Sequence, residues 1–187
     1  SATVAEAAAA LGLPPERITA VLPGTDPAAA APLTAHRPHH LLTVATVTPR
    51  KGHRLLVEAL APLRDRPWRL TCVGSLSRDP ACLAELRATL DRLGLAERVD
   101  LLDEVDQPRL DAIYRTADLF VLPSFLEGYG MAIAEALARG LPVVTTEASA
   151  IVETLSSDGL VTVPPGDRDR LTGVLERLLD HPEAYAR

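Results

Sequence analysis

The chain has 187 residues, 47% hydrophobic and 24% charged, with a formal net charge of −6. This length and composition predict one ordinary globular domain and argue against a disordered or fibrous chain. The acidic balance disfavours a general nucleic-acid or anionic-membrane surface, no apolar run reaches the roughly 18 residues of a membrane span, and two cysteines cannot form a disulfide framework. A cytoplasmic location is therefore expected.

The first 40 residues differ in pattern from the rest. ITAVLPG is a plausible strand and turn, and AAAAPLTAHRPHH is a connection rich in proline, alanine and histidine. Its histidines (His36, His39 and His40) lack the helical spacing and accompanying thiolates of a metal cluster, so we expect a solvated loop there and no metal. The chain also starts without methionine, and we assign residues 1–40 to a lead-in segment and connection from a missing N-terminal domain.

From residue 41 to residue 187, short apolar runs alternate with helical patterns. The expected strands are LLTVATV, RLTCVG, RVDLL, DLFVLPS, PVVTT and LVTV, and the expected helices are HRLLVEALAPL, ACLAELRATLDRLG, PRLDAIYRTA, GMAIAEALARG, AIVETL and DRLTGVLERLLDH. Strands without polar alternation are buried on both faces, and the helices supply the crossovers that parallel strands need. Gly94 and Gly140 stand where two helices should end. The pattern predicts an α/β fold with a doubly wound, Rossmann-like parallel sheet.

Ligands of such sheets bind outside the carboxyl ends of the strands, at the switch point in strand order. In the loop TPRKGH, Arg50 and Lys51 could hold a phosphate near a helix N-terminus, although a solvated basic turn is the alternative. The loop GSLSRDP has one glycine, Gly74, where a dinucleotide fingerprint needs three, which disfavours NAD binding. Gly74 either allows close approach of a ligand or forms a tight strand exit.

A third loop, SFLEGYG, precedes a helix of small residues. Gly128, Tyr129 and Gly130 leave the backbone amides at the helix N-terminus with little side-chain cover, which favours an anion site. Glu127 lies just ahead and could accept hydrogen bonds from hydroxyls. Glu135, eight positions later, would lie beside the same ligand. The alternative is one glutamate that interacts with the helix dipole and one on the surface.

The stretch LPSFLEGYGMAIAEALARGLPVV resembles the GT4 family of retaining glycosyltransferases, whose C-terminal domain carries Pro-Ser, Glu-Gly-(Phe/Tyr)-Gly, a second Glu after seven residues, and Ala-x-x-x-Gly-x-Pro-Val-Val. TPRKGHRLLVEAL resembles the phosphate loop of that family, and RLTCVGS, RLGLAERVDLL and LVTVPPGD follow in the family's order. The resemblance covers residues 17–180. It implies one half of a GT-B fold, with residues 41–187 forming its nucleotide-sugar-binding domain.

The resemblance also implies roles for the site residues. Arg50 and Lys51 would hold the donor diphosphate, Glu127 the sugar hydroxyls and Glu135 the ribose diol, while the amides from Gly128 to Met131 would reach phosphate or sugar. The base would be recognised near VDLLDEVD. No cofactor or metal is implied, and the acceptor, whether a sugar, a lipid or a small molecule, would be bound by the missing N-terminal domain.

Two departures from the family pattern stand out. TTEASAIVETL keeps Glu153 but lacks the family's preceding glycine pair, and the acceptor-binding domain is absent. We therefore expect the donor-binding domain of a retaining glycosyltransferase, able to bind a nucleotide diphosphate sugar but inactive alone. A sugar-nucleotide epimerase and a non-catalytic module that senses nucleotide sugars are the alternatives.

Overall fold

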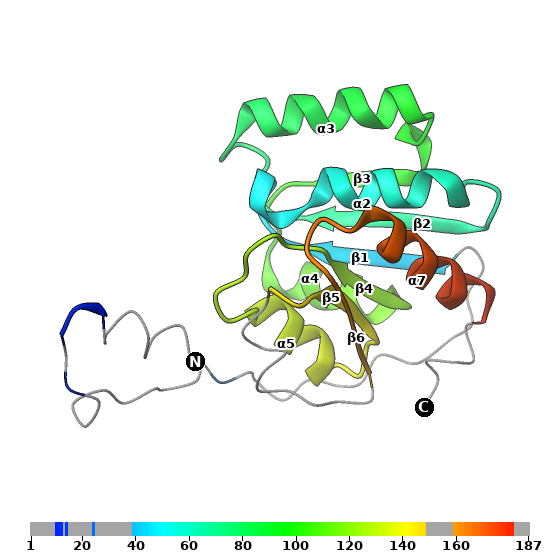
Figure 1. The fold of residues 1–187 in the computed structure, drawn as a ribbon. Coiled ribbons are helices and arrows are strands. Elements are labelled where there is room, and N and C mark those ends of the chain that lie inside the picture. Colours follow the sequence, from blue (N-terminus) through cyan, green and yellow to red (C-terminus); the bar gives the residue numbers. More distant parts are fainter. Residues whose placement is uncertain (1–9, 13, 15–23, 25–38, 149–158, 182–187) are drawn as a thin grey trace.

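The computed structural model describes residues 10–12, 14, 24, 39–148 and 159–181. Within them, helices cover both faces of a six-stranded parallel sheet (Figure 1). The strands are β1 (His39–Val44), β2 (Trp68–Val73), β3 (Val99–Leu102), β4 (Leu119–Leu122), β5 (Val143–Thr146) and β6 (Leu160–Val163). The α-helices are α2 (His53–Leu60), α3 (Pro80–Leu93), α4 (Gln107–Thr116), α5 (Met131–Ala138) and α7 (Arg168–Asp180), and short 3-10 turns are η2 (Pro49–Lys51), η3 (Ala61–Leu63) and η4 (Ala96–Arg98).

The strand order is β3-β2-β1-β4-β5-β6, and all the pairings are parallel. From β1, the sheet extends in one direction through β2 and β3, and in the other direction through β4, β5 and β6. The order therefore reverses between β1 and β4, where Leu41 is in register with Leu119. This is the switch point of a doubly wound sheet, and it confirms the fold class predicted from the sequence.

The core lies on both faces of the sheet. Successive side chains of a strand point to opposite faces, so the adjacent buried residues Leu41 and Leu42 belong to different clusters, as do Val143 and Val144. One cluster is completed by α2, α3 and α7, and the other by α4 and α5. This two-sided burial explains why the strands read as continuous apolar runs.

Two predicted helix ends are confirmed. Gly94 follows α3 with φ of 67°, and Gly140 follows α5 with φ of 72°. The amide of Gly94 donates to Asp91 O, and the amide of Gly140 donates to Leu137 O, so both glycines satisfy carbonyls of the last helical turn.

The prediction of a solvated loop at the histidines was wrong for His39 and His40, which are the first two residues of β1. His39 is 2% exposed. The ring nitrogens of His40 lie 2.7 Å from Thr71 Oγ1 and 3.0 Å from the carbonyl oxygen of Thr116. These contacts let a polar side chain occupy a strand position that the apolar pattern did not include.

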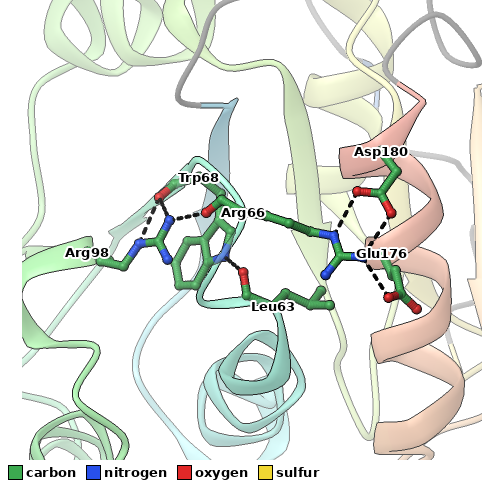
Figure 2. Close-up of polar contacts among 6 residues, drawn as sticks. All are labelled: Leu63, Arg66, Trp68, Arg98, Glu176 and Asp180. Atoms are coloured by element: carbon green, nitrogen blue, oxygen red, sulfur yellow. Dashed lines mark hydrogen bonds and ion pairs between the residues drawn. The ribbon is translucent and has the colours of Figure 1, made fainter.

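A polar clamp holds the amino-terminal end of β2 (Figure 2). The guanidinium of Arg98 donates to the carbonyl oxygens of Trp68 and Arg66 and lies 4.1 Å from the centre of the Trp68 ring. Arg66 in turn pairs with two carboxylates of α7, at 2.7 Å from Asp180 Oδ1 and 2.7 Å from Glu176 Oε1. The clamp joins the segment before β2 to the start of β3 and to α7, at the end of β2 away from the predicted site.

Some sequence predictions lie outside the described residues. They are the strand in ITAVLPG, the helix in AIVETL with Glu153, and the environment of His36. The division of the chain at residue 40 stays a prediction.

Candidate functional site

The site is built around the switch point. The chain leaves β1 toward α2 on one face of the sheet and leaves β4 toward α5 on the other (Figure 1). Because β1 and β4 are neighbours, the loops that follow them start at the same edge of the sheet, where ligands of doubly wound sheets bind. The loops that carry Lys51 and Glu127 are therefore at the same edge, as the sequence predicted.

The two loops are held together by backbone contacts. The amide of Phe125 donates to the carbonyl oxygen of Arg50 at 2.7 Å. Gly52 adopts the left-handed φ of 73°, and a Cβ atom there would overlap the carbonyl oxygen of Pro123. A glycine is required at this position both for the backbone angle and for the close approach.

Lys51 and Glu127 form an ion pair between the two loops, from Nζ to Oε2. Their side chains are only 12% and 11% exposed. The hydroxyl of Ser124 donates to the same oxygen, Oε2, at 3.2 Å. The arrangement places a cation and a carboxylate side by side, so a diphosphate and a neutral hydroxylated group could each find a partner there.

Arg50 lies differently from Lys51. Its guanidinium is exposed and donates to the carbonyl oxygen of Leu126 at 3.3 Å. An open pocket of about 800 Å³ on the α2 side is lined by Arg50 and Phe125, but Lys51 and Glu127 are not in its lining. The two predicted phosphate-binding cations therefore have different surroundings, Arg50 in the lining of this pocket and Lys51 in contact with Glu127.

His53, the first residue of α2, is buried behind these loops and is 2% exposed. Burial, and then the charge of Lys51, lower the pKa of His53 to about 4, while the backbone of Ala45 acts in the opposite direction. The imidazole is therefore neutral at physiological pH. Nothing in the sequence indicates that this side chain is buried, because a histidine after a basic turn is typical of an exposed residue.

The N-terminus of α5 faces the same edge of the sheet. Its cap is Gly130, with φ of 88° and no side-chain hydrogen bond to the first turn. Gly128 and Met131 are exposed, whereas Tyr129 is half-buried. The loop between β4 and α5 is held by the last residue of β5, because Thr146 Oγ1 donates to the carbonyl oxygen of Ser124 at 2.5 Å. Uncapped amides at a fixed helix N-terminus are suited to an anion.

Glu135 lies in the second turn of α5 and is half-buried. The hydroxyl of Tyr114, from α4, donates to its Oε2 atom at 3.4 Å. Tyr114 and its neighbour Arg139 were missed in the sequence, because nothing in the pattern of either helix indicates which residues face each other across the α4–α5 contact.

Gly74 ends β2 with φ of 143°, and a Cβ atom there would overlap the carbonyl oxygen of Ala45, which follows β1. Close packing of two neighbouring strand ends accounts for this glycine. The second role considered from the sequence, close approach of a ligand, stays a prediction.

Among the described residues, no group of three or more His, Cys, Asp or Glu side chains could hold a metal ion. In the same part of the chain, no helix has the length and apolar character needed to cross a membrane.

The six-stranded parallel sheet is Rossmann-like, and its structural neighbours are glycosyltransferases of the GT-B class. The lipopolysaccharide outer core galactosyltransferase WaaB shares the fold with a TM-score of 0.78 at 20% identity, over 97% of this chain and 52% of WaaB. Anabaena HepE, solved in complex with UDP, has a TM-score of 0.68 at 26% identity, over 79% of this chain and 40% of HepE.

Residues 38–181 match the family model described as glycosyl transferases group 1, and the chain belongs to this family. A D-inositol 3-phosphate glycosyltransferase of Jonesia denitrificans is 33% identical over 183 residues, which cover 87% of this chain and 43% of the relative. The chain thus spans less than half the length of this relative. The family membership confirms the resemblance found in the sequence.

Proposed function

We propose that this chain is the donor-binding domain of a retaining glycosyltransferase that takes its sugar from a nucleoside diphosphate sugar. The observation that carries the proposal is the meeting of Lys51 and Glu127 at the switch point, beside the uncapped N-terminus of α5. One neighbour in fold, Anabaena HepE, has been solved with UDP-glucose, which supports the same donor chemistry here.

The proposed roles follow from charge. Lys51 and the amides at residues 128–131 bind the diphosphate, because a cation and free helix N-terminal amides both favour an anion. Glu127 accepts hydrogen bonds from sugar hydroxyls, and Glu135 accepts them from the ribose diol. Arg50 reaches the diphosphate only after its guanidinium leaves the carbonyl of Leu126.

Donor binding by this chain requires neither a metal nor a cofactor in the proposal. The acceptor, a sugar, a lipid or a small molecule, is bound by an N-terminal domain outside this chain, and closure of that domain excludes water from the reacting centre. Transfer keeps the configuration of the anomeric carbon. A cytoplasmic location is part of the proposal and agrees with the free thiols of Cys72 and Cys82.

The test is calorimetric titration of the chain with UDP, GDP and ADP and with a glucose and a mannose derivative of each. We expect one base to be preferred, with binding of both its diphosphate and a sugar derivative, and no sugar transfer by this chain alone. Failure to bind any of these ligands would refute a donor-binding domain. Robust transfer would place the catalytic groups within this chain and would refute the need for a second domain.

Two substitutions separate the diphosphate from the sugar. Lys51→Met should weaken the diphosphate and the nucleotide sugar alike, by the roughly 1.5 to 3 kcal/mol of a charged hydrogen bond. Glu127→Gln should weaken the nucleotide sugar more than the diphosphate, because the sugar hydroxyls are its proposed partners. Equal losses for both ligands in Glu127→Gln would contradict the role of this carboxylate.

A further inference from the structure

The Glu135 carboxylate is held at the contact between α4 and α5. Tyr114 of α4 is fully buried, and its hydroxyl donates to Glu135 Oε2 at 3.4 Å. Burial, and then the negative charge of Glu135, raise the pKa of the Tyr114 hydroxyl. The hydroxyl therefore keeps its proton throughout the physiological range and remains a hydrogen-bond donor.

The ring of Tyr114 is itself fixed in place. The guanidinium carbon of Arg139 lies 4.4 Å from the ring centre, and the ring stacks with Phe120 of β4 at 6.3 Å between centroids. Arg139 is 9% exposed and is anchored at 2.6 Å to Asp111 and at 3.1 Å to the carbonyl oxygen of Glu135. A buried cation above the ring both packs against it and ties α4 to α5.

The two oxygens of the Glu135 carboxylate differ in their contacts, because only Oε2 is contacted by the Tyr114 hydroxyl. A distance of 3.4 Å is long for an O–H···O hydrogen bond, so the contact orients Oε2 and uses little of the carboxylate's accepting capacity. Within the described residues Oε1 accepts no side-chain hydrogen bond. An ionised carboxylate has about four lone-pair sites, which leaves room for both hydroxyls of a vicinal diol.

We infer that Tyr114 is a positioning residue that sets the orientation of the Glu135 carboxylate for the ribose diol of the donor nucleotide. The inference rests on the proposed function and adds to it a determinant of the preference for ribose over deoxyribose. Tyr114 acts through Glu135 and does not contact the ligand.

The test compares Tyr114→Phe with the unaltered chain. UDP, GDP and ADP and their 2′-deoxy forms are titrated, and the base whose ribonucleotide binds most tightly is used for the comparison. Tyr114→Phe keeps the ring between Arg139 and Phe120, so the fold should be retained. We expect a loss of about 3-fold in affinity for the ribonucleotide, at the weak end of the range of one hydrogen bond because the contact is long, and less than about twofold for the deoxynucleotide. The ratio of ribonucleotide affinity to deoxynucleotide affinity should therefore decrease in this variant.

Two further variants complete the experiment. In a Glu135→Gln background, Tyr114→Phe should add less than about twofold, because two residues that act through one interaction are not additive. Ala112→Ser, an exposed position on the same helix, is the matched control and should leave the affinity ratio unchanged.

The outcomes separate this inference from the proposed function. If Glu135→Gln lowers the ratio of ribonucleotide to deoxynucleotide affinity and Tyr114→Phe does not, the positioning role is refuted and donor binding stands. An equal loss for both nucleotides in Tyr114→Phe would mean a purely structural role and would also overturn the inference. If none of the six nucleotides binds the unaltered chain, the proposed function fails, and the positioning role fails with it.

Discussion

Replacing His53 with leucine should remove about 2 kcal/mol of the stability that the fold loses between pH 7.5 and pH 5. In the native protein burial lowers the pKa of His53 to about 4, against 6.5 for the free side chain. Between these two values the unfolded chain binds a proton that the native state does not. Stability is therefore intact above pH 6.5 and falls as the pH decreases toward 4.

The magnitude follows from the distance between the pH and the unfolded pKa. At pH 5 the difference is 1.5 units, and at 1.36 kcal/mol per unit the loss is about 2 kcal/mol. The assay is urea unfolding at both pH values, with the free energy extrapolated to water. The variant keeps four of the five histidines, whose titration cancels in the comparison of the two proteins.

The expected result is a loss of about 2 kcal/mol that is present in the unaltered chain and absent in His53→Leu. At pH 7.5 the variant should be about as stable, because neither ring nitrogen of His53 makes a hydrogen bond of normal geometry within the described residues, and the backbone contact with Ala45 that raises the pKa of His53 is weaker than the effect of burial. Parallel pH profiles for the two proteins would refute the reasoning, because they would place the titrating group elsewhere.

Three further predictions concern stability. Gly52→Ala should destabilise the fold by at least about 1 to 2 kcal/mol from its left-handed backbone alone. Gly128→Ala, whose added Cβ atom would meet no atom within 4 Å, should cost far less in the same urea assay. Similar losses of unfolding free energy in the two variants would contradict the steric argument. Arg98→Lys keeps the charge but loses the planar fork that donates to the Trp68 carbonyl, and it should lower the free energy of unfolding by about 1 to 3 kcal/mol. An unchanged urea midpoint would show that the clamp contributes little. Lys51→Met should destabilise the fold by about 1 to 3 kcal/mol and the double variant with Glu127→Gln by less, because the second change removes the unpaired carboxylate. Additive losses in that double-mutant cycle would contradict a direct pair.

Much of the fold could be predicted, because strands that are buried on both faces appear in the sequence as continuous apolar runs. The run LLTVATV has no polar alternation, and its strand is packed on both sides. His39 and His40 were missed at the start of the same strand. Side-chain contacts such as that of His40 with Thr71 make a histidine compatible with a strand, and they depend on the neighbouring strand.

The meeting of the two loops was predicted from the sequence, but the contacts between their side chains were not. Parallel strands bring their carboxyl ends to one edge, so the meeting of two conspicuous loops could be expected from the pattern. That Lys51 pairs with Glu127, 76 residues away, depends on β1 lying beside β4. The same holds for Tyr114 and Glu135, which meet only because α4 and α5 pack on one face of the sheet.

The strand order also has a consequence for how the chain holds together. Residues 39–102 form one continuous β-α-β-α-β unit, and residues 119–163 contribute β4, β5 and β6 on the other side of the β1–β4 pairing. This pairing joins segments far apart in the chain, so its loop-closure entropy is larger than that of the local pairings. The candidate site at Lys51 and Glu127 lies on this seam. A nucleotide bound to Lys51 from one unit and to α5 from the other would act as a non-covalent crosslink, and amide hydrogen exchange along β1 and β4 would slow as the seam is held closed.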